Sequence, residues 1–208
     1  MRILFQGDSI TDADRNKADD TRLGTGYPRL VEATLGYEEP NKHEFINKGI
    51  SGNRIVDLYA RIKSDIINLK PDFISILIGV NDVWHELREN PNGVDADKFY
   101  KIYSMLIEEI RSALPNTKII ILEPFVLQGC STEERWDDFS KEVPLRAKMA
   151  KRVAEENNLP FVELQKGFDE LCKKAPPSYW LSDGVHPSAK GHEYIKNQWL
   201  KAYYSINR

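Results

Sequence analysis

Phe73-Ile-Ser-Ile-Leu-Ile78 and Ile119-Ile-Ile-Leu122 are the stretches that decide the fold predicted by this sequence. Both are almost entirely apolar, which is typical of strands that are buried on both faces of a parallel sheet. Gly79 follows the first stretch and Glu123-Pro124 follows the second, so both strands are expected to end at these residues.

Short apolar runs alternate with amphipathic stretches along the rest of the chain. Three more runs have the length of strands: residues 3–5, 45–47 and 161–164. Five stretches have the pattern of amphipathic helices: residues 28–35, 55–69, 97–114, 144–157 and 189–204. Strands that alternate with helices in this way predict an α/β fold, a three-layer α/β/α sandwich with a central five-stranded parallel sheet.

The length and composition are those of an ordinary globular protein. The 208 residues suit one domain, which we expect to span residues 1–208. The net charge is only −3, and no basic surplus points to nucleic acid or to an anionic membrane as a partner. Cys130 and Cys172 are far apart and form no CxxC pair, so we expect two free thiols.

The beginning of the sequence carries no pattern of a secretory signal. No basic segment is followed by an apolar stretch and a cleavage site, and no apolar run approaches the about 20 residues of a membrane helix. We therefore expect a cytoplasmic protein without a membrane partner. Assembly into a homo-oligomer stays open.

The segments that follow the strands are where a ligand is expected. In open parallel sheets the ligand lies beyond the carboxyl ends of the strands. Three of the segments at these positions are small, polar and rich in glycine: Gly7-Asp8-Ser9, Gly49-Ile-Ser-Gly-Asn53 and Gly79-Val-Asn-Asp82.

Ser9 is the candidate nucleophile of this site. A serine hydroxyl is a weak nucleophile unless a base takes its proton, and His186 is the candidate base. Asp183 precedes His186 by three residues on one predicted tight loop, and Gly184 permits the turn. The carboxylate can then fix the imidazole tautomer and stabilise the imidazolium, so we predict a triad of Ser9, Asp183 and His186.

Three donors are candidates for an oxyanion hole. The backbone N–H of Ser9 opens a predicted helix and therefore lacks a partner within that helix. Gly52 can bring a second N–H close because it has no side chain, and Asn81 can add a neutral amide. Gly49 is an alternative to Gly52.

The same segments resemble the four signature blocks of the SGNH, or GDS-motif, serine hydrolases. The blocks are Gly7-Asp8-Ser9, Gly52, Asn81 and Asp183-Gly-Val-His186-Pro, and they occur in the order of that family over nearly the whole chain. The resemblance implies the flavodoxin-like SGNH fold, the five site residues named above and an acyl-Ser9 intermediate. It implies no metal and no other cofactor. Ile10-Thr11 after Ser9 departs from the Gly-x-Ser-x-Gly elbow of α/β-hydrolases.

Longer stretches are similar to the intracellular acetylxylan esterases of this family. These stretches are Leu23-Gly-Thr-Gly-Tyr27, Asn47-Lys-Gly-Ile-Ser-Gly-Asn53 and Ile78-Gly-Val-Asn-Asp-Val-Trp84. The similarity implies hydrolysis of short-chain acetyl esters on xylo-oligosaccharides or related carbohydrates, which are small-molecule partners. Lysophospholipase or thioesterase-type acyl hydrolases and deacetylases of other sugars remain alternatives, although no long apolar insertion is present to shelter an acyl chain.

Trp84 and Trp180 flank the segments of Asn81 and Asp183, so both are candidates to bind the apolar face of a sugar. Packing in the core is the equally plain alternative for each. Residues 128–140 are expected to be a loop that forms either a wall of the site or an oligomer contact.

Three nearby polar residues have simpler interpretations than catalysis. Asp8 is expected to cap the helix that Ser9 begins, and Asp82 to order the segment of Asn81. His192 could join Asp183 and His186 in a metal site, but the serine hydrolase interpretation already uses two of the three.

A flavodoxin-like binding protein that cradles phosphate on residues 7–11 is the alternative that is not an enzyme, although the Gly-x-Gly-x-x-Gly and Walker patterns are absent.

Overall fold

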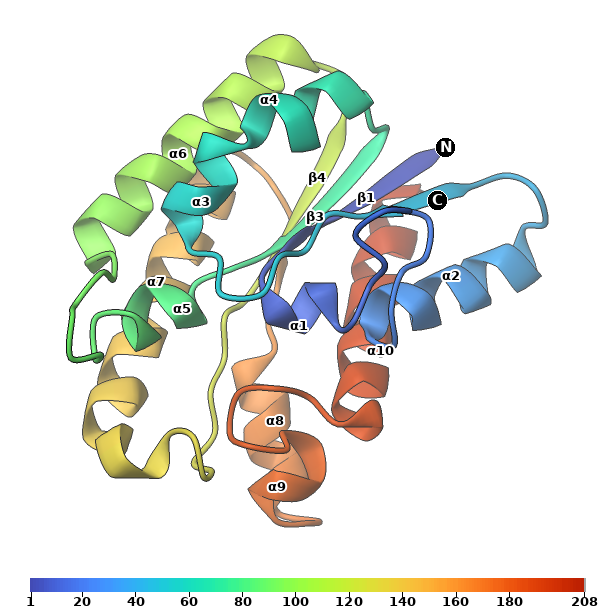
Figure 1. Cartoon of the computed structure of the whole chain (residues 1–208). Coiled ribbons are helices and arrows are strands. Elements are labelled where there is room, and N and C mark those ends of the chain that lie inside the picture. The colour runs from blue at the N-terminus through green and yellow to red at the C-terminus, as the bar shows by residue number, and fades with distance from the viewer. Residues whose placement is uncertain (208) are drawn as a thin grey trace.

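A computed structural model describes residues 1–207 and contains a five-stranded sheet in the order β2-β1-β3-β4-β5 (Figure 1). The strands are β1 (Arg2–Gly7), β2 (Glu44–Asn47), β3 (Phe73–Leu77), β4 (Lys118–Leu122) and β5 (Phe161–Val162). All neighbouring strands pair in parallel. This is the strand order of the flavodoxin-like doubly wound sheets. The predicted α/β fold with five parallel strands is confirmed.

Helices cover both faces of the sheet (Figure 1). On one face lie α2 (Tyr27–Glu38), α8 (Gln165–Cys172) and α10 (Ala189–Asn207). On the other lie α3 (Ile55–Ala60), α4 (Ile62–Asp65), α6 (Ala96–Ala113) and α7 (Trp136–Glu156). The short elements are α1 (Ser9–Asp12), α5 (Val80–Trp84), α9 (Pro177–Trp180), and the 3₁₀ turns η1 (Ile67–Leu69) and η2 (Glu133–Arg135).

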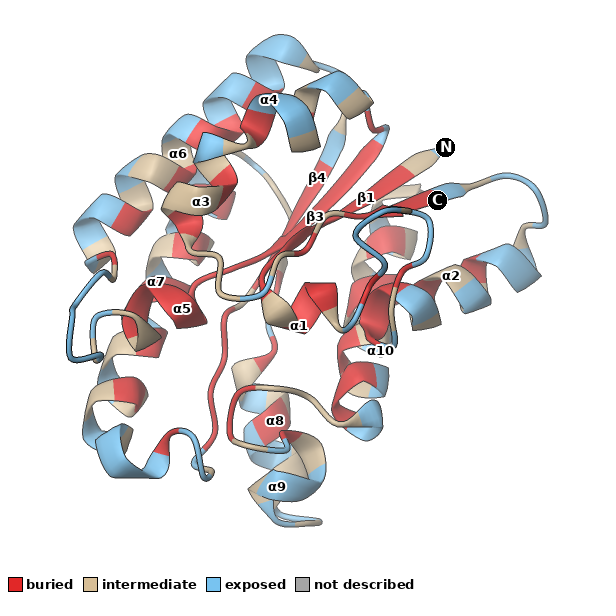
Figure 2. Cartoon of the chain, viewed as in Figure 1, coloured by how far each residue is buried: buried red, intermediate tan, exposed pale blue. Residues whose placement is uncertain are grey.

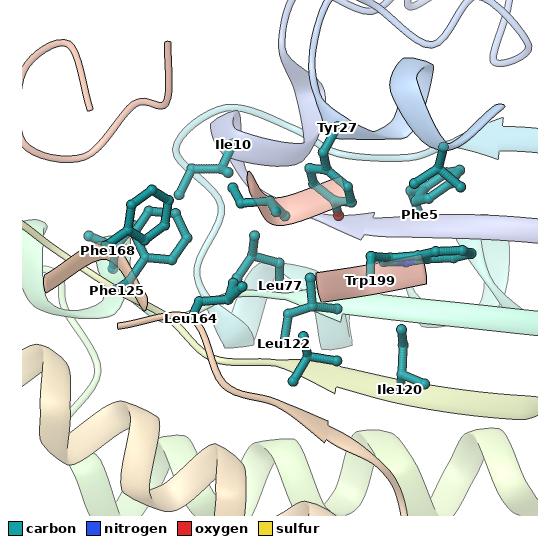
Figure 3. Close-up of a cluster of buried hydrophobic side chains, with 14 of the residues drawn as sticks. Phe5, Ile10, Tyr27, Leu77, Ile120, Leu122, Phe125, Leu164, Phe168 and Trp199 are labelled. Carbon is teal, nitrogen blue, oxygen red and sulfur yellow. The ribbon is translucent and has the colours of Figure 1, made fainter. Parts of the chain in front are cut away.

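Alternation along the strands divides the core into two clusters, one on each face of the sheet. In β3, Phe73 and Leu77 enter the cluster beneath α2 and α10, whereas Ile74 and Ile76 enter the cluster beneath α6 and α7. Apart from the first residue of β1, β2, β4 and β5, the strands are therefore buried, while the outer faces of the helices are exposed (Figure 2). Trp199 of α10 is fully buried against the sheet in the first cluster (Figure 3).

Two helices differ from the expectation. The predicted helix over residues 55–69 is divided into α3, α4 and η1, because the backbone leaves helical geometry at Arg61 and Ile66. The Arg61 guanidinium donates hydrogen bonds to the carbonyl of Lys48 and to Asn53 Oδ1. The spacing of apolar residues in the sequence cannot predict these contacts with distant residues. The predicted start at residue 144 is wrong as well, since α7 begins at Trp136 and contains Pro144 in its interior.

Two expectations drawn from composition concern thiols and membranes. Cys130 and Cys172 are both free thiols, as expected. Within residues 1–207, none of the helices combines the length and the apolar character that crossing a membrane requires.

Candidate active site

Ser9 is the first residue of α1. This helix follows β1 at the carboxyl edge of the sheet (Figure 1). The Asp8 side chain caps α1 by accepting a hydrogen bond from the N–H of Ile10 at 3.0 Å, the capping role expected for it. A Cβ atom at Gly7 would overlap the carbonyl oxygen of Leu77 and the side chain of Thr11. The strand therefore turns into the helix at once, and this turn leaves the Ser9 side chain partly exposed.

The structure brings Ser9, His186 and Asp183 into one chain of hydrogen bonds. Ser9 Oγ lies 2.9 Å from His186 Nε2, and His186 Nδ1 lies 2.7 Å from Asp183 Oδ2. The other carboxylate oxygen, Oδ1, accepts the N–H groups of Val185 at 2.9 Å and His186 at 2.8 Å. Gly184 makes this turn possible with a φ of 100°. With the proton on Nδ1, Nε2 is free to accept the proton of Ser9.

The Asp183–His186 pair perturbs the pKa of both groups. The hydrogen bond that His186 donates to Asp183 raises the pKa of His186 above its ordinary value of 6.5, although burial opposes this effect. Burial alone would raise the pKa of Asp183, but hydrogen bonds from His186 and Val185 outweigh it and hold that pKa well below 3.8. The sequence left open which influence prevails at His186. In the structure the carboxylate prevails over burial.

Gly52 is better suited than Gly49 to supply a backbone donor. Gly49 donates its N–H to Asn47 Oδ1 at 2.9 Å, and a Cβ atom there would overlap the backbone of Asp12. Gly52 has a φ of 83°, and a Cβ atom there would meet nothing within 4 Å. In the described part of the chain, the N–H groups of Gly52 and Ser9 donate no hydrogen bond. Both are available for an oxyanion.

Asn81 lies on α5, directly after β3, and is buried. Its Nδ2 donates to the carbonyl of Asn53 at 3.2 Å, which leaves the second amide hydrogen unused. The neighbouring Asp82 carboxylate accepts the N–H of Ile55 at 3.0 Å. Two adjacent side chains thus tie the segment of Asn81 to the segment of Gly52.

The two candidate tryptophans have different surroundings. The centroid of the Trp84 ring lies 6.1 Å from that of the His186 ring, at an interplanar angle of 46°. The centroid of the Phe139 ring lies 5.9 Å from that of Trp84. The indole N–H of Trp180 donates to the carbonyls of Leu171 at 3.1 Å and Ala175 at 3.3 Å. Trp84 is therefore next to the triad, whereas the hydrogen bonds of Trp180 join α9 to the end of α8.

His192 does not join the triad through a hydrogen bond. Its Nδ1 accepts the N–H of Tyr27 at 3.1 Å and so caps α2. Burial, together with the nearby charge of His186, lowers the pKa of His192 to about 4. Across residues 1–207, no group of three or more His, Cys, Asp and Glu side chains is arranged to hold a metal ion.

Residues 128–140 are not a continuous loop, because they contain η2 and the first turn of α7. Phe139 is buried in the core, and Trp136 lines a groove with Leu127, Cys172 and Pro177. The groove is not lined by any residue of the triad.

Ser131, which the sequence did not single out, donates a hydrogen bond to Asp183 Oδ2 at 3.2 Å. No local motif marks this contact, since 52 residues separate the partners.

Comparison with known proteins decides the family. The model of the GDSL-like lipase/acylhydrolase family matches residues 5–194. The chain belongs to this family. The resemblance to SGNH hydrolases is thereby confirmed, and all the proposed site residues lie within the matched region of the GDSL-like family.

Two esterases are among the proteins to which this chain is similar. The chain is 34% identical to an acetylxylan esterase of Geobacillus stearothermophilus over 210 residues, which cover 96% of this chain and 92% of the relative. It is 24% identical to an isoamyl acetate-hydrolysing esterase of Saccharomyces cerevisiae, over 96% of this chain and 84% of that one. The first relationship confirms the chain as a homologue of a carboxylic ester hydrolase, and hence as an enzyme.

Solved structures agree with this relationship. A protein described as a GDSL-like lipase from Parabacteroides merdae matches with a TM-score of 0.89 and 37% identity, over 97% of this chain and 94% of that one. Axe2, the acetylxylan esterase from Geobacillus stearothermophilus, matches with a TM-score of 0.87 and 34% identity, over 97% and 93%. Catalytic mutants of Axe2 replace a serine, an aspartate and a histidine. That aspartate precedes that histidine by three residues, which is the spacing of Asp183 and His186.

Proposed function

We propose that this protein is a serine esterase that removes acetyl groups from carbohydrate esters, with acetylated xylo-oligosaccharides as the leading substrate class. The observation that carries the proposal is the chain of hydrogen bonds from Ser9 through His186 to Asp183. The proposed nucleophile, base and orienting carboxylate are joined by direct hydrogen bonds, with no other group between them.

In the first half of the reaction, Ser9 Oγ attacks the ester carbonyl carbon while His186 Nε2 takes the hydroxyl proton. The tetrahedral intermediate then releases the sugar alcohol, which receives that proton from His186. This leaves an acetyl-Ser9 ester. In the second half, water loses a proton to His186 and attacks the acetyl carbon. The bond between that carbon and Ser9 Oγ then breaks, His186 returns the proton to Ser9 Oγ, and acetate is released.

The oxyanion of each tetrahedral intermediate requires donors that are already in place. We assign this role to the N–H of Ser9, the N–H of Gly52 and the amide of Asn81. The two N–H groups donate no other hydrogen bond within residues 1–207, and Asn81 uses one of its two amide hydrogens. No positive charge or metal ion is needed for this stabilisation.

The acetyl group is favoured by the relatives and by the site. Both characterised relatives are named for acetyl esters, an acetylxylan esterase and an isoamyl acetate-hydrolysing esterase. Trp84 beside His186 offers an aromatic surface to the sugar that carries the ester. We do not favour a lysophospholipase or thioesterase activity, because the apolar groove near Trp136 is lined by none of the triad residues.

We further propose that residues 1–208 form one domain. The sheet draws its strands from both halves of the chain, and α10 packs onto it near the C-terminal end, in support of this view. A cytoplasmic location and the absence of nucleic-acid and membrane partners stay predictions from the sequence, which leaves assembly into a homo-oligomer open.

The test is hydrolysis of a series of p-nitrophenyl esters from acetyl to octanoyl, followed by acetylated xylo-oligosaccharides and a lysophospholipid. We expect the highest kcat/KM for acetyl esters, and release of acetate from the oligosaccharides. Ser9→Ala should lower kcat by several orders of magnitude while the protein stays folded. Faster turnover of octanoyl than of acetyl esters would refute the acetyl preference. Retention of a tenth of the wild-type kcat in Ser9→Ala would refute Ser9 as the nucleophile.

A further inference from the structure

The segment that follows β4 is fastened to the backbone around Asp183. The N–H of Leu127 donates to the carbonyl of Gly184 at 2.8 Å, and the N–H of Ser131 donates to the carbonyl of Asp183 at 3.0 Å. The two segments touch without room for side chains, because a Cβ atom at Gly129 would overlap the backbone of Asp183. Residues 127–132, which we call the clamp, therefore hold the loop of the proposed catalytic acid from the outside.

Thr132, the last residue of the clamp, is buried. The Thr132 hydroxyl donates to the carbonyl of Leu127 at 2.8 Å and accepts the N–H of Gly129 at 2.9 Å. These bonds close the clamp on itself. Ser131, although exposed to solvent, is consequently held at a fixed position against Asp183.

The Ser131 hydroxyl donates to Asp183 Oδ2 at 3.2 Å. This is the same oxygen that meets His186 Nδ1 at 2.7 Å, whereas Oδ1 is occupied by two backbone N–H groups. We propose that Ser131 is a positioning residue for the esterase reaction, whose hydroxyl shares Asp183 Oδ2 with His186 and thereby limits how strongly the carboxylate holds the imidazole. This inference rests on the proposed function of the triad.

A hydroxyl hydrogen on Oδ2 places the positive end of a dipole beside the imidazole, and this disfavours the imidazolium. Removal of the hydroxyl should therefore raise the pKa of His186 further above 6.5. Two other titratable groups interact electrostatically with His186. Asp8, at the turn after β1, raises the pKa of His186, and the charge of His186 lowers the pKa of His192 on α10. Neither contacts Ser131, so a change at Ser131 reaches His186 through Asp183.

The experiment compares Ser131→Ala, Ser131→Thr and the control Ser205→Ala with the wild type. Ser205 is also exposed, and its hydroxyl donates one hydrogen bond to the carbonyl of Ala202 near the C-terminal end of α10, whereas His186 precedes the N-terminal end of that helix. We expect Ser131→Ala to move the acidic limb of kcat/KM upward by about half a pH unit, which is about a threefold loss of activity on that limb. Activity on the plateau and KM should stay within about twofold, because Ser131 acts through Asp183 rather than on the substrate.

The second measurement does not depend on catalysis. The titration of the His186 ring is followed by NMR, with the signal assigned by comparison with His186→Asn. We expect the same upward shift in Ser131→Ala, and wild-type values in Ser131→Thr, which keeps the hydroxyl, and in Ser205→Ala.

Three results would overturn the inference: an acidic limb and titration unchanged in Ser131→Ala, a shift to lower pH, or a Ser131→Thr variant that is folded and behaves like Ser131→Ala. The last would assign the effect to packing of the clamp. If the wild type hydrolysed no ester, the proposed function would fail, whereas the NMR titration would still decide whether Ser131 is coupled to His186. If Ser9→Ala abolished activity and Ser131→Ala changed nothing, only this inference would fail.

Discussion

Ser9 Oγ lies 2.9 Å from His186 Nε2, although 177 residues separate the two in the chain. Ser9 follows the first strand, and His186 lies on the loop before the last helix. The contact arises because α10 packs on the face of the sheet that contains Phe5 of β1, so that its preceding loop reaches the carboxyl edge. The expected properties of the site follow from this contact.

The pH dependence of kcat/KM should report His186. The imidazole must be neutral to accept the Ser9 proton, and Asp183 raises its pKa above 6.5. Activity should therefore be full at alkaline pH and fall as the pH drops through a midpoint above 6.5. A rate profile with p-nitrophenyl acetate from pH 4 to 9 measures this midpoint. A kcat/KM that stayed flat down to pH ~4 would exclude histidine as the general base.

Asn81→Ala should separate transition-state stabilisation from substrate binding. If the amide donates mainly to the oxyanion, kcat should fall by ~10²–10³ while KM changes little. Because Asn81 also donates to the carbonyl of Asn53, circular dichroism and thermal unfolding must show that the variant is folded. A full kcat would remove Asn81 from the oxyanion hole, and a raised KM alone would make it a substrate-binding residue.

Trp84→Ala and Trp180→Ala should have different consequences. Trp84 lies beside His186, so its loss should raise KM for acetylated xylo-oligosaccharides several-fold more than for p-nitrophenyl acetate. Trp180 donates two hydrogen bonds to backbone carbonyls, so its loss should lower the free energy of unfolding by about 2–3 kcal/mol and leave KM unchanged. Steady-state kinetics and denaturant unfolding of both variants check this. An unchanged stability with a raised KM in Trp180→Ala would instead place Trp180 in the substrate site.

Asp8→Asn should change how stability depends on pH. One oxygen of Asp8 caps α1 while the other, Oδ2, is buried without a partner, and burial raises the pKa of this group from 3.8 to about 7. A group whose pKa is raised in the folded state contributes stability below pH 3.8 and loses it as the pH rises to about 7. Asparagine keeps the cap but does not titrate.

The stability of Asp8→Asn relative to the wild type should therefore improve between pH 5 and pH 8, by on the order of 1–3 kcal/mol. Urea unfolding at the two pH values measures this difference, and the comparison between pH values removes the cost of burying the extra amide hydrogens. An equal effect of the substitution at both pH values would show that Asp8 does not carry a raised pKa.

Much of the fold could be predicted from local pattern. Residues 73–78 and 119–122 are apolar on both faces, so they had to be central strands, and β3 and β4 lie there. The segments after the strands had to meet at one edge of a parallel sheet, and Ser9 and Asn81 lie at the ends of β1 and β3. The spacing of Asp183 and His186 is local, and one turn is enough to bring their side chains together.

The tertiary structure decided what depends on contacts between distant segments. Periodicity cannot show that Arg61 leaves helical geometry and binds the carbonyl of Lys48 beyond β2, or that α7 begins before Pro144 with Phe139 buried in the core. It cannot distinguish Trp84, which lies beside His186, from Trp180, whose N–H is held by backbone carbonyls.

The same limit applies to the electrostatics of the site. Whether burial or Asp183 governs the pKa of His186 depends on the solvent exposure and the hydrogen-bond lengths of the folded chain, as does the contact of Ser131 with Asp183. The sequence by itself therefore determined which side chains are the candidates for the proposed chemistry, because residue type and local spacing are written in it. Only the tertiary structure decided their partners and their charge, because both depend on what packs around each group once the chain is folded.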